Sequence, residues 1–472
     1  MNEIKSEKSS IEKSAMKYSS STHLSYSIGQ MVKQFLEVAF TIRVFFYYEN
    51  EVLLPVLLVG LGYIIYGFWN MINDPLVGFL SDKSKRFTKR WGKRFPWIML
   101  GVFGNILAYL LIFTPPDIDV KANPTLMFLY FLIVICLFDG CFSLFTINYY
   151  SIFPLKFTSE DERRKVNAIK TILAQIGLFL AVLIPPMFIE YGNKQSYLIA
   201  AGVVSFFATV LAISMIKGVK EDKELKETII SLDDSREHEN FFKNLKLALR
   251  QKNFTAYVVS ATLFNIFAII IMASLPFLVR YILKMPAETE SILLVGFLLT
   301  AVISVPAWTK ISKKYGNKNL YTIGFFISMV LSFLFLFIQE IIFAMILMLL
   351  AGISVGALWV GTFLILSDVI DESVLINKKR QEGIYFGIVN FFGRLEIVAQ
   401  ALVFTVIHIL TGFEAGASSQ DTLALWGLRI QISIIPMVSM LIGGIIFWKF
   451  YNLTPERVKS IQDELKELDL QK

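Results

Sequence analysis

Residues 69–97 read WNMINDPLVGFLSDKSKRFTKRWGKRFPW, and the rest of the chain can be interpreted from this stretch. It starts in an apolar segment that contains Asp74, passes through a loop rich in Lys and Arg, and re-enters an apolar segment at residue 96. An ionisable side chain within a membrane span is costly and usually faces a polar cavity. Loops rich in Lys and Arg lie on the cytoplasmic side of a membrane. The stretch therefore predicts two membrane spans joined by a cytoplasmic loop, with Asp74 facing the protein interior.

The composition is typical of a polytopic membrane protein. Of 472 residues, 55% are hydrophobic and 14% aromatic, and the mean hydropathy is +0.60. Only 18% are charged, against about 25% in soluble domains. Apolar runs long enough to cross a bilayer recur along the chain. The formal net charge of +7 resides in loops between these runs. Topology therefore explains the charge, and we expect a lipid bilayer and no nucleic acid as a partner.

Other residue types argue against an enzyme or a metal centre. Cys136 and Cys141 lie in one apolar segment, five positions apart, which disfavours a disulfide and a metal site. The histidines His23, His238 and His408 are far apart in sequence. No Gly-rich phosphate loop or nucleophile motif is present. The sequence therefore predicts that the protein is not an enzyme and has no cofactor. The only ion expected is a coupling ion, Na⁺ or H⁺.

The apolar runs predict twelve spans in two sets of six. The first set covers approximately 26–48, 53–80, 95–113, 125–153, 166–189 and 196–216. The second set covers approximately 254–283, 292–311, 320–337, 341–370, 384–410 and 425–448. The polar start of the chain has no apolar region typical of a cleavable signal peptide. The first span would therefore act as the insertion signal.

Five segments are predicted from this pattern. They are a cytoplasmic tail at 1–22, a six-helix bundle at 23–217, a cytoplasmic linker at 218–252, a second six-helix bundle at 253–452, and a cytoplasmic tail at 453–472. An even number of spans places both termini on one side, and the distribution of Lys and Arg among the loops makes that side cytoplasmic. Two six-span halves around a linker are the layout of the major facilitator fold. We expect an all-α, multi-pass protein of the plasma membrane with 12 transmembrane helices.

The second span holds the candidates for cation coupling. Asn70, Asn73 and Asp74 lie on about one helical turn, beside a helix break expected before Pro75. Their oxygen atoms suit a monovalent cation or a proton. The alternative is a capping or inter-helix hydrogen-bond cluster.

The fourth span holds candidates for substrate binding. Asp139, Ser143 and Thr146 are spaced i, i+4, i+7 and share one helical face, and Tyr150 follows. An acid, hydroxyl groups and an aromatic ring on one face form a plausible wall for a polyol or another polar solute. The alternative is a helix–helix interface held by small polar groups.

Polar or aromatic side chains in other spans extend this candidate cavity. They are Gln34, Lys170, Trp359, Asn390 and Arg394. Arg394 lies deep in an apolar run and is expected to pair with Asp74 or Asp139 of the other half, or locally with Glu396. Charged residues near the cytoplasmic edge are candidates for a gate. They are Asp82, Arg90, Arg94, Arg163, Asp371, Arg380 and Glu382.

Several motifs are more specific. The chain has NDPLVG at 73–78, RWGKRFPW at 90–97, LSY at 24–26, RQEG at 380–383 and FYNL at 450–453. These motifs, in this order along essentially the whole chain, resemble the melibiose permease family. That family comprises the glycoside–pentoside–hexuronide:cation symporters of the major facilitator superfamily, and its animal relatives include a lysophospholipid transporter.

The resemblance implies roles that this sequence matches only in part. The family's cation site uses two acids one turn apart in the second span, and here Asp74 matches while Asn70 replaces the first acid. The loss of one negative charge favours a proton, or no coupling, over sodium. The family's sugar-binding acids align with Gln34 and Thr146, and its basic residues with Arg394 and Lys170.

The sequence as a whole predicts a monomeric secondary transporter that uses a proton or sodium gradient to move a small polar solute, a sugar or glycoside, by alternating access. Two alternatives stay open. The first is a transporter of an anionic or lysolipid-like amphiphile, which Arg394 and Lys170 would suit. The second is a non-transporting receptor with a transporter fold.

Overall fold

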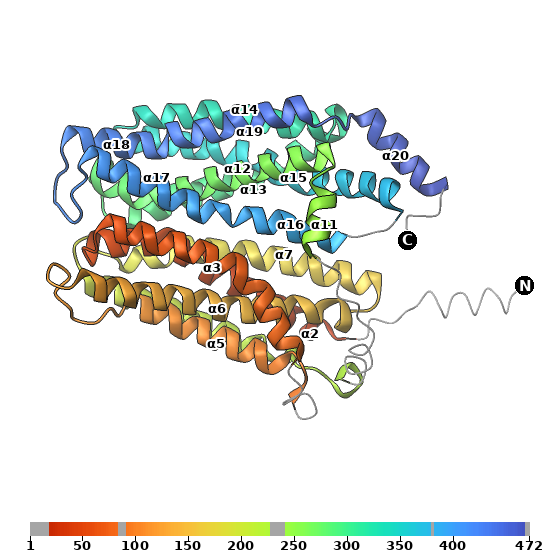
Figure 1. The fold of residues 1–472 in the computed structure, drawn as a ribbon, viewed down its shortest axis with the longest axis horizontal. Coiled ribbons are helices and arrows are strands. Elements are labelled where there is room, and N and C mark those ends of the chain that lie inside the picture. The colour runs from red at the N-terminus through yellow and green to blue at the C-terminus, as the bar shows by residue number, and fades with distance from the viewer. Residues whose placement is uncertain (1–17, 84–90, 227–240, 379–381, 468–472) are drawn as a thin grey trace, which may run out of the picture.

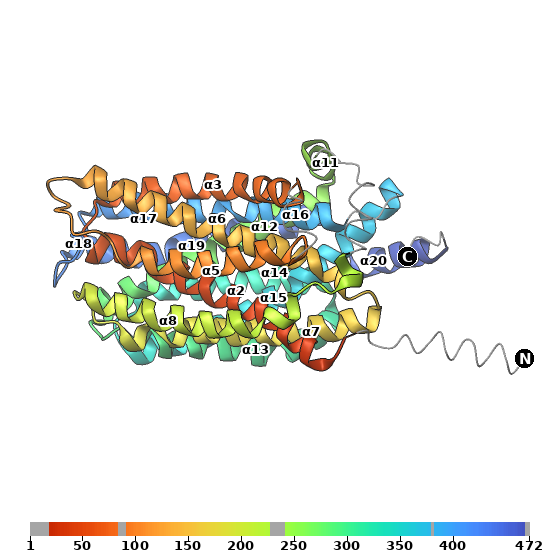
Figure 2. The ribbon, with the colours of Figure 1, turned by 90° about the horizontal axis from the view of Figure 1, so that it is seen from below.

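The computed structural model describes residues 18–83, 91–226, 241–378 and 382–467, and within these residues all regular structure is helical. The long helices run side by side along the long axis of the molecule and form two bundles (Figure 1; Figure 2). Both chain termini leave from the same end, which we call the terminal end, and we call the opposite end the far end.

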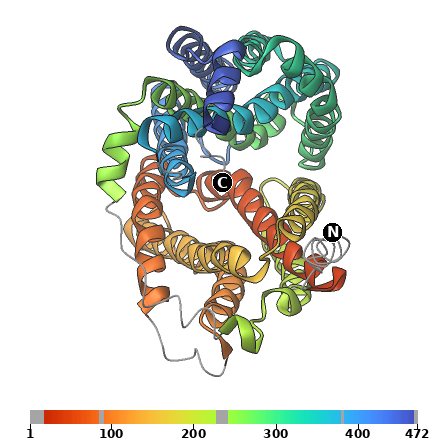
Figure 3. The ribbon, with the colours of Figure 1, turned by 90° about the vertical axis from the view of Figure 1, so that its right-hand side faces the viewer.

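The N-terminal bundle contains six long helices. They are α2 (Ser20–Phe46), α3 (Val56–Lys83), α5 (Phe95–Ile112), α6 (Pro124–Lys156), α7 (Glu160–Leu183) and α8 (Lys194–Ser214). Short helical turns extend this bundle at η1 (Tyr47–Glu51), η2 (Pro185–Phe188) and α9 (Ile216–Val219). A short helix, α11 (Phe241–Ala248), follows and lies on the outside of the molecule, in contact with the C-terminal bundle (Figure 3).

The C-terminal bundle repeats the arrangement, with two of its spans divided. Its helices are α12 (Lys252–Phe277), α13 (Glu288–Tyr315), α14 (Asn317–Leu334), α15 (Ile341–Asn377), α16 (Glu382–Gly393) with α17 (Leu395–Thr411), and α18 (Thr422–Ile432) with α19 (Ile434–Phe450). The turns η4 (Leu278–Leu283) and η5 (Phe335–Phe337) extend α12 and α14, and α20 (Pro455–Glu467) ends the described chain.

Eleven helical segments of the described chain are long and apolar enough to cross a membrane. The helix α2 is not among them, because Lys33, Glu37 and Arg43 lower its hydropathy. It nevertheless packs along α7 inside the N-terminal bundle. Helices predominate because a bilayer offers the backbone no hydrogen-bond partner, so each span must satisfy its own N–H and C=O groups.

Local sequence signals set some helix boundaries and failed to set others. Ser159 caps α7, its Oγ accepting a hydrogen bond of 3.2 Å from the Glu162 N–H, and acidic residues follow in the first turn. The predicted helix break before Pro75 is wrong, since α3 continues through Pro75 to Lys83. The eleventh span is instead interrupted at Arg394, between α16 and α17.

Helices α3 and α17 bring the two bundles into close contact. A Cβ atom on Gly60 would lie 1.9 Å from Thr405 Oγ1, and one on Gly67 would lie 2.6 Å from Val398 Cγ2. Neither position can hold a larger residue unless the facing side chain or its helix shifts. Small residues at such crossings allow close packing of membrane helices.

A layer of buried polar contacts joins the bundles at the far end. Glu49, Asn50 and Glu51 of η1 all contribute. Glu49 bonds His408 at 2.6 Å, Asn50 accepts from the Tyr281 hydroxyl at 2.6 Å, and Glu51 pairs with Arg280 at 2.7 Å. A fourth contact in this layer is the ion pair between Arg43 of α2 and Glu290 of α13. We call this set the far-end contact layer.

Aromatic rings close the interface just inside that layer. The ring centroids of Phe45 and Phe404 lie 5.0 Å apart, those of Phe277 and Phe404 5.7 Å, and those of Phe45 and Tyr63 5.2 Å. The rings come from α2 and α3 of one bundle and from α12 and α17 of the other. Apolar packing and buried ion pairs together hold the far end of the bundle interface closed.

We predict that Glu290→Gln lowers the thermal unfolding temperature of the purified protein by several degrees. The substitution leaves the buried guanidinium of Arg43 without a counter-charge, which typically costs about 3–5 kcal/mol. The control is Arg164→Gln. It breaks a pair with Glu160 whose side chains are 71% and 78% exposed, and such pairs contribute about 0–1 kcal/mol. Equal unfolding temperatures for the two variants would contradict the importance of the buried pair.

Candidate functional site

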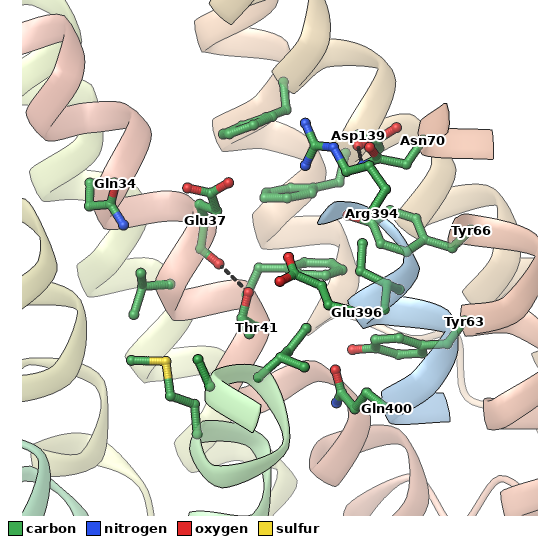
Figure 4. Close-up of a pocket in the computed structure, with 18 residues that line it drawn as sticks. Gln34, Glu37, Thr41, Tyr63, Tyr66, Asn70, Asp139, Arg394, Glu396 and Gln400 are labelled. Atoms are coloured by element: carbon green, nitrogen blue, oxygen red, sulfur yellow. Dashed lines mark hydrogen bonds between the residues drawn. The ribbon is translucent and has the colours of Figure 1, made fainter. Parts of the chain in front are cut away.

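A cavity of about 250 Å³ lies between the two bundles (Figure 4). It is lined from α2, α3 and α6 on one side and from α12 and α17, with Arg394 at the break before it, on the other. Its polar lining residues are Gln34, Glu37, Thr41, Tyr63, Tyr66, Asn70, Asp139, Arg394, Glu396 and Gln400. Because both bundles contribute to the wall, a molecule bound here would contact both.

Asp139 is the most enclosed acid of the cavity wall, with 1% of the residue exposed. Its carboxylate accepts hydrogen bonds from the amide nitrogen atoms of Asn70 and Asn73, the latter at 3.1 Å. Asn73 also donates to the Asp139 carbonyl oxygen at 3.2 Å. These bonds fix α3 against α6 and compensate the burial of the charge.

Asp74 lies next to this cluster and links the two bundles. One carboxylate oxygen accepts a hydrogen bond of 2.5 Å from Ser143 Oγ, and the other lies 3.5 Å from a guanidinium nitrogen of Arg394. Of the partners that the sequence left open for Arg394, this contact selects Asp74. The interruption of the eleventh span at Arg394 places the guanidinium at the edge of the cavity.

The structure brings four sequence-predicted residues together in the cavity lining. They are Gln34, Asn70, Asp139 and Arg394. Ser143 and Asn73 lie behind the wall, bonded to Asp74 and Asp139. Thr146 is buried on the same helix as Asp139.

The remaining predicted cavity residues lie elsewhere. Tyr150 is exposed and donates a hydrogen bond of 3.0 Å to Gln30. The ammonium group of Lys170 lies 5.3 Å from the centre of the Tyr150 ring. Trp359 lines a separate apolar cavity of about 60 Å³, and Asn390 is exposed on α16. None of these four side chains lines the central cavity.

The candidate gate residues that the structure describes lie towards the terminal end. Arg94 is buried and donates hydrogen bonds to Ser81 Oγ at 3.2 Å and Asn148 Oδ1 at 3.1 Å. Arg163 donates to backbone carbonyl oxygens of the same bundle. The other candidates are Asp371, half-buried near the end of α15; Glu382, exposed at the start of α16; Asp82, in the last turn of α3; and Arg90 and Arg380, which lie outside the described residues.

The prediction of the cavity missed several lining residues. Glu37, Glu396 and Gln400 are visible in the sequence as polar groups within spans, and Glu396 and Gln400 are one turn apart on one helical face. That spacing was a usable signal for a shared cavity face. Tyr63 and Tyr66 carried no such signal, because aromatic residues are common throughout the spans.

The charges of the lining residues limit what the cavity can hold. Glu37, Asp139 and Glu396 are acidic, and Arg394 is basic. Glu37 also pairs with Lys33 at 2.6 Å. Carboxylates accept hydrogen bonds and repel anions. The arrangement therefore suits a solute that carries hydroxyl groups or positive charge, and it disfavours a purely anionic one.

Comparisons with known proteins agree with this architecture. The family model described as MFS/sugar transport protein matches residues 25–455. "Sodium-dependent lysophosphatidylcholine symporter 1" of Mus musculus is 24% identical over 434 residues, which cover 85% of this chain and 79% of that protein. "Inner membrane symporter YicJ" of Escherichia coli (strain K12) is 22% identical over 94% of both proteins.

The fold is also that of solved transporters. The crystal structure of nucleoside transporter NupG superposes with a TM-score of 0.61 at 14% identity, covering 92% of this chain and all of that chain. This likeness confirms the predicted all-α major facilitator fold with two six-helix bundles. The match of the family model to nearly the whole chain confirms the predicted family, which is a family of transporters and not of enzymes. The chain is a multi-pass membrane transport protein and belongs to the MFS/sugar transport protein family of the major facilitator superfamily.

Proposed function

We propose that the protein is a cation-coupled symporter that moves a small polar solute, a sugar or glycoside, by alternating access. The observation that carries this proposal is the Asp74–Arg394 pair, which joins the two bundles at the edge of the central cavity. A cation that binds Asp74 competes with Arg394 for the same carboxylate. Cation binding is thereby coupled to a change at a residue that lines the solute cavity.

The coupling step follows from this competition. When a proton or Na⁺ occupies Asp74, the guanidinium of Arg394 is released and can donate hydrogen bonds to the solute. The amide nitrogen atoms of Asn70 and Asn73 donate to Asp139. These bonds leave the amide oxygens unused, and the Oδ1 of Asn70 is buried without a hydrogen-bond partner within the described residues. A proton needs only the Asp74 carboxylate, which favours H⁺ over Na⁺. The relative from Mus musculus is named as sodium-dependent, so both ions are tested.

Alternating access requires the far-end contact layer to open. In the present conformation this layer and the aromatic rings beneath it close the far end. We propose that the terminal end faces the cytoplasm and that the structure represents the inward-facing half of the cycle. The gate predicted from Asp82 and the basic loop after it falls mostly on residues 84–90, which lie outside the described residues.

The size and charge of the cavity support a small solute. Its volume of about 250 Å³ is near the lower end of small-molecule sites, roughly 300–1,000 Å³. Tyr63, Tyr66 and Phe138 supply apolar faces, and the acids and amides supply hydrogen-bonding groups. Sugars combine these two requirements, because they have apolar ring faces and many hydroxyl groups.

A second candidate cargo is a lysolipid-like amphiphile. It is favoured by the similarity to the relative from Mus musculus, which is named as a lysophosphatidylcholine symporter. The acidic lining argues against a headgroup with net negative charge, although a zwitterionic headgroup could pair with both Arg394 and the carboxylates. The two candidates differ in the ligand that stabilises the protein.

We predict that Asp74→Asn abolishes concentrative uptake in proteoliposomes with an imposed gradient, while exchange of solute continues. The amide that replaces the carboxylate cannot take up a proton, and it cannot form an ion pair with Arg394 as the carboxylate does. The measurement is uptake of radiolabelled solute with a proton or sodium gradient. Asp117→Asn, which neutralises an exposed acid between α5 and α6, is the matched control and should accumulate solute normally. Full accumulation by Asp74→Asn would rule out the coupling role.

We predict that neutral sugars or glycosides raise the thermal unfolding temperature of the purified protein by several degrees, since a ligand that binds only the folded state stabilises it. The screen compares sugars, glycosides and lysophosphatidylcholine, each with and without sodium and at two pH values. Stabilisation by the lysolipid alone would favour the amphiphile as cargo. A sugar that stabilises the protein but is never transported in proteoliposomes would indicate a receptor.

A further inference from the structure

The amide nitrogen of Gln400, in the lining of the central cavity, is buried without a hydrogen bond to the described residues. Gln400 is 1% exposed, and its Nε2 has no hydrogen-bond partner within the part of the chain that the structure describes. Buried polar groups of this kind are rare and costly. Gln431, a comparable glutamine in the same bundle, is fully buried, with its amide bonded to His408 at 2.9 Å and to Ser274 at 3.0 Å. The difference between the two glutamines indicates that Gln400 is arranged for a bound molecule.

Gln400 belongs to a group of hydrogen-bonding side chains at one end of the cavity. Glu396 lies one turn earlier on α17, and Tyr63 of α3 faces both across the bundle interface (Figure 4). Asp139 and Asn70 gather at the opposite end of the view, beside Arg394. We call the group of Tyr63, Glu396 and Gln400 the floor cluster.

Within the floor cluster, Gln400 is the residue of α17 farthest from Arg394. It lies six positions after Arg394, a rise of about 9 Å along the helix at 1.5 Å per residue, whereas Glu396 lies between them. Arg394 and Gln400 both line the cavity. A solute that contacts both Arg394 and Gln400 needs hydrogen-bonding groups at two ends, as in two linked rings or in one ring with a polar substituent.

The hydrogen-bonding chemistry of the cluster defines the group it binds. The Gln400 Nε2 donates, the Glu396 carboxylate accepts, and the Tyr63 hydroxyl can do either. A hydroxyl-bearing group can accept from Gln400 and donate to Glu396 at the same time, whereas a phosphate or carboxylate would be repelled by Glu396. An apolar chain would leave both polar groups unpaired.

We propose that the floor cluster is a second polar subsite, which binds the hydroxyl-bearing, uncharged end of a solute whose other end contacts Arg394 and Asp139. This subsite deepens the proposed function and rests on it. It assigns Gln400 and Glu396 as residues that select for length and for hydroxyl groups.

The test compares Gln400→Leu with Gln431→Leu in the full-length purified protein. The probes are five neutral disaccharides: sucrose, lactose, maltose, trehalose and melibiose. Two quantities are measured for each variant, the unfolding temperature without ligand and the dissociation constant of any disaccharide that binds the wild type.

Without ligand, Gln400→Leu should keep or raise the unfolding temperature, because an unpaired amide is replaced by an apolar side chain of similar size. Gln431→Leu should lower the unfolding temperature, because it removes two hydrogen bonds of a buried network. With ligand, Gln400→Leu should weaken disaccharide binding about two- to tenfold, the value of one lost hydrogen bond.

Disaccharide binding unchanged in Gln400→Leu would overturn the subsite and leave the proposed function standing. A fall in the ligand-free unfolding temperature as large as that of Gln431→Leu would overturn it too, since Gln400 would then be structural. If the wild type binds none of the five probes, the subsite fails, whereas the sugar form of the proposed function fails only if the sugars and glycosides of the thermal screen also fail to stabilise the protein.

Discussion

Charged side chains inside this molecule are tolerated where they are paired, and several of the pairs span the two bundles. Arg43 pairs with Glu290, Arg280 with Glu51, and Arg394 with Asp74. A buried charge that loses its partner is strongly destabilising, because the low-dielectric interior offers no other compensation. The bundles can therefore separate at either end only if these charges are hydrated or find new partners. This constraint turns the bundle interface into a set of discrete contacts that can be exchanged during a transport cycle.

In the lining of the central cavity, the acidic side chains outnumber the basic side chains that could pair with them. Glu37 is paired with Lys33 and Asp139 with two amides, but the cavity lining as a whole is more acidic than basic. An excess of acceptors calls for donors from the solute, which hydroxyl groups or a cation supply. The same excess explains why Arg394 is placed at the edge of the cavity, where it can contact Asp74 or a solute.

The departures from the melibiose permease pattern gain a physical interpretation from this cavity. The positions aligned with the family's sugar-binding acids hold Gln34 and Thr146, and Asn70 replaces an acid of the cation site. Carboxylates are nevertheless present in the same cavity, at Glu37, Asp139 and Glu396. The chain retains an acidic chamber while moving its charges to other helical positions.

Hydropathy and charge are properties of short segments, so the sequence alone was sufficient for the number and type of spans, the two halves and the family. It also identified Asp74, Asp139 and Arg394 as internal, because a charge in an apolar run cannot face lipid. Tertiary structure decided which charged groups pair with one another. Contacts such as Arg43–Glu290 and Glu49–His408 join residues 247 and 359 positions apart. It also decided which polar side chains share the cavity, since the rotation of each helix about its axis depends on packing. Glu396 and Gln400 are visible in the sequence as polar groups within a span. Only the approach of α3 to α17 places them in one cavity with Tyr63.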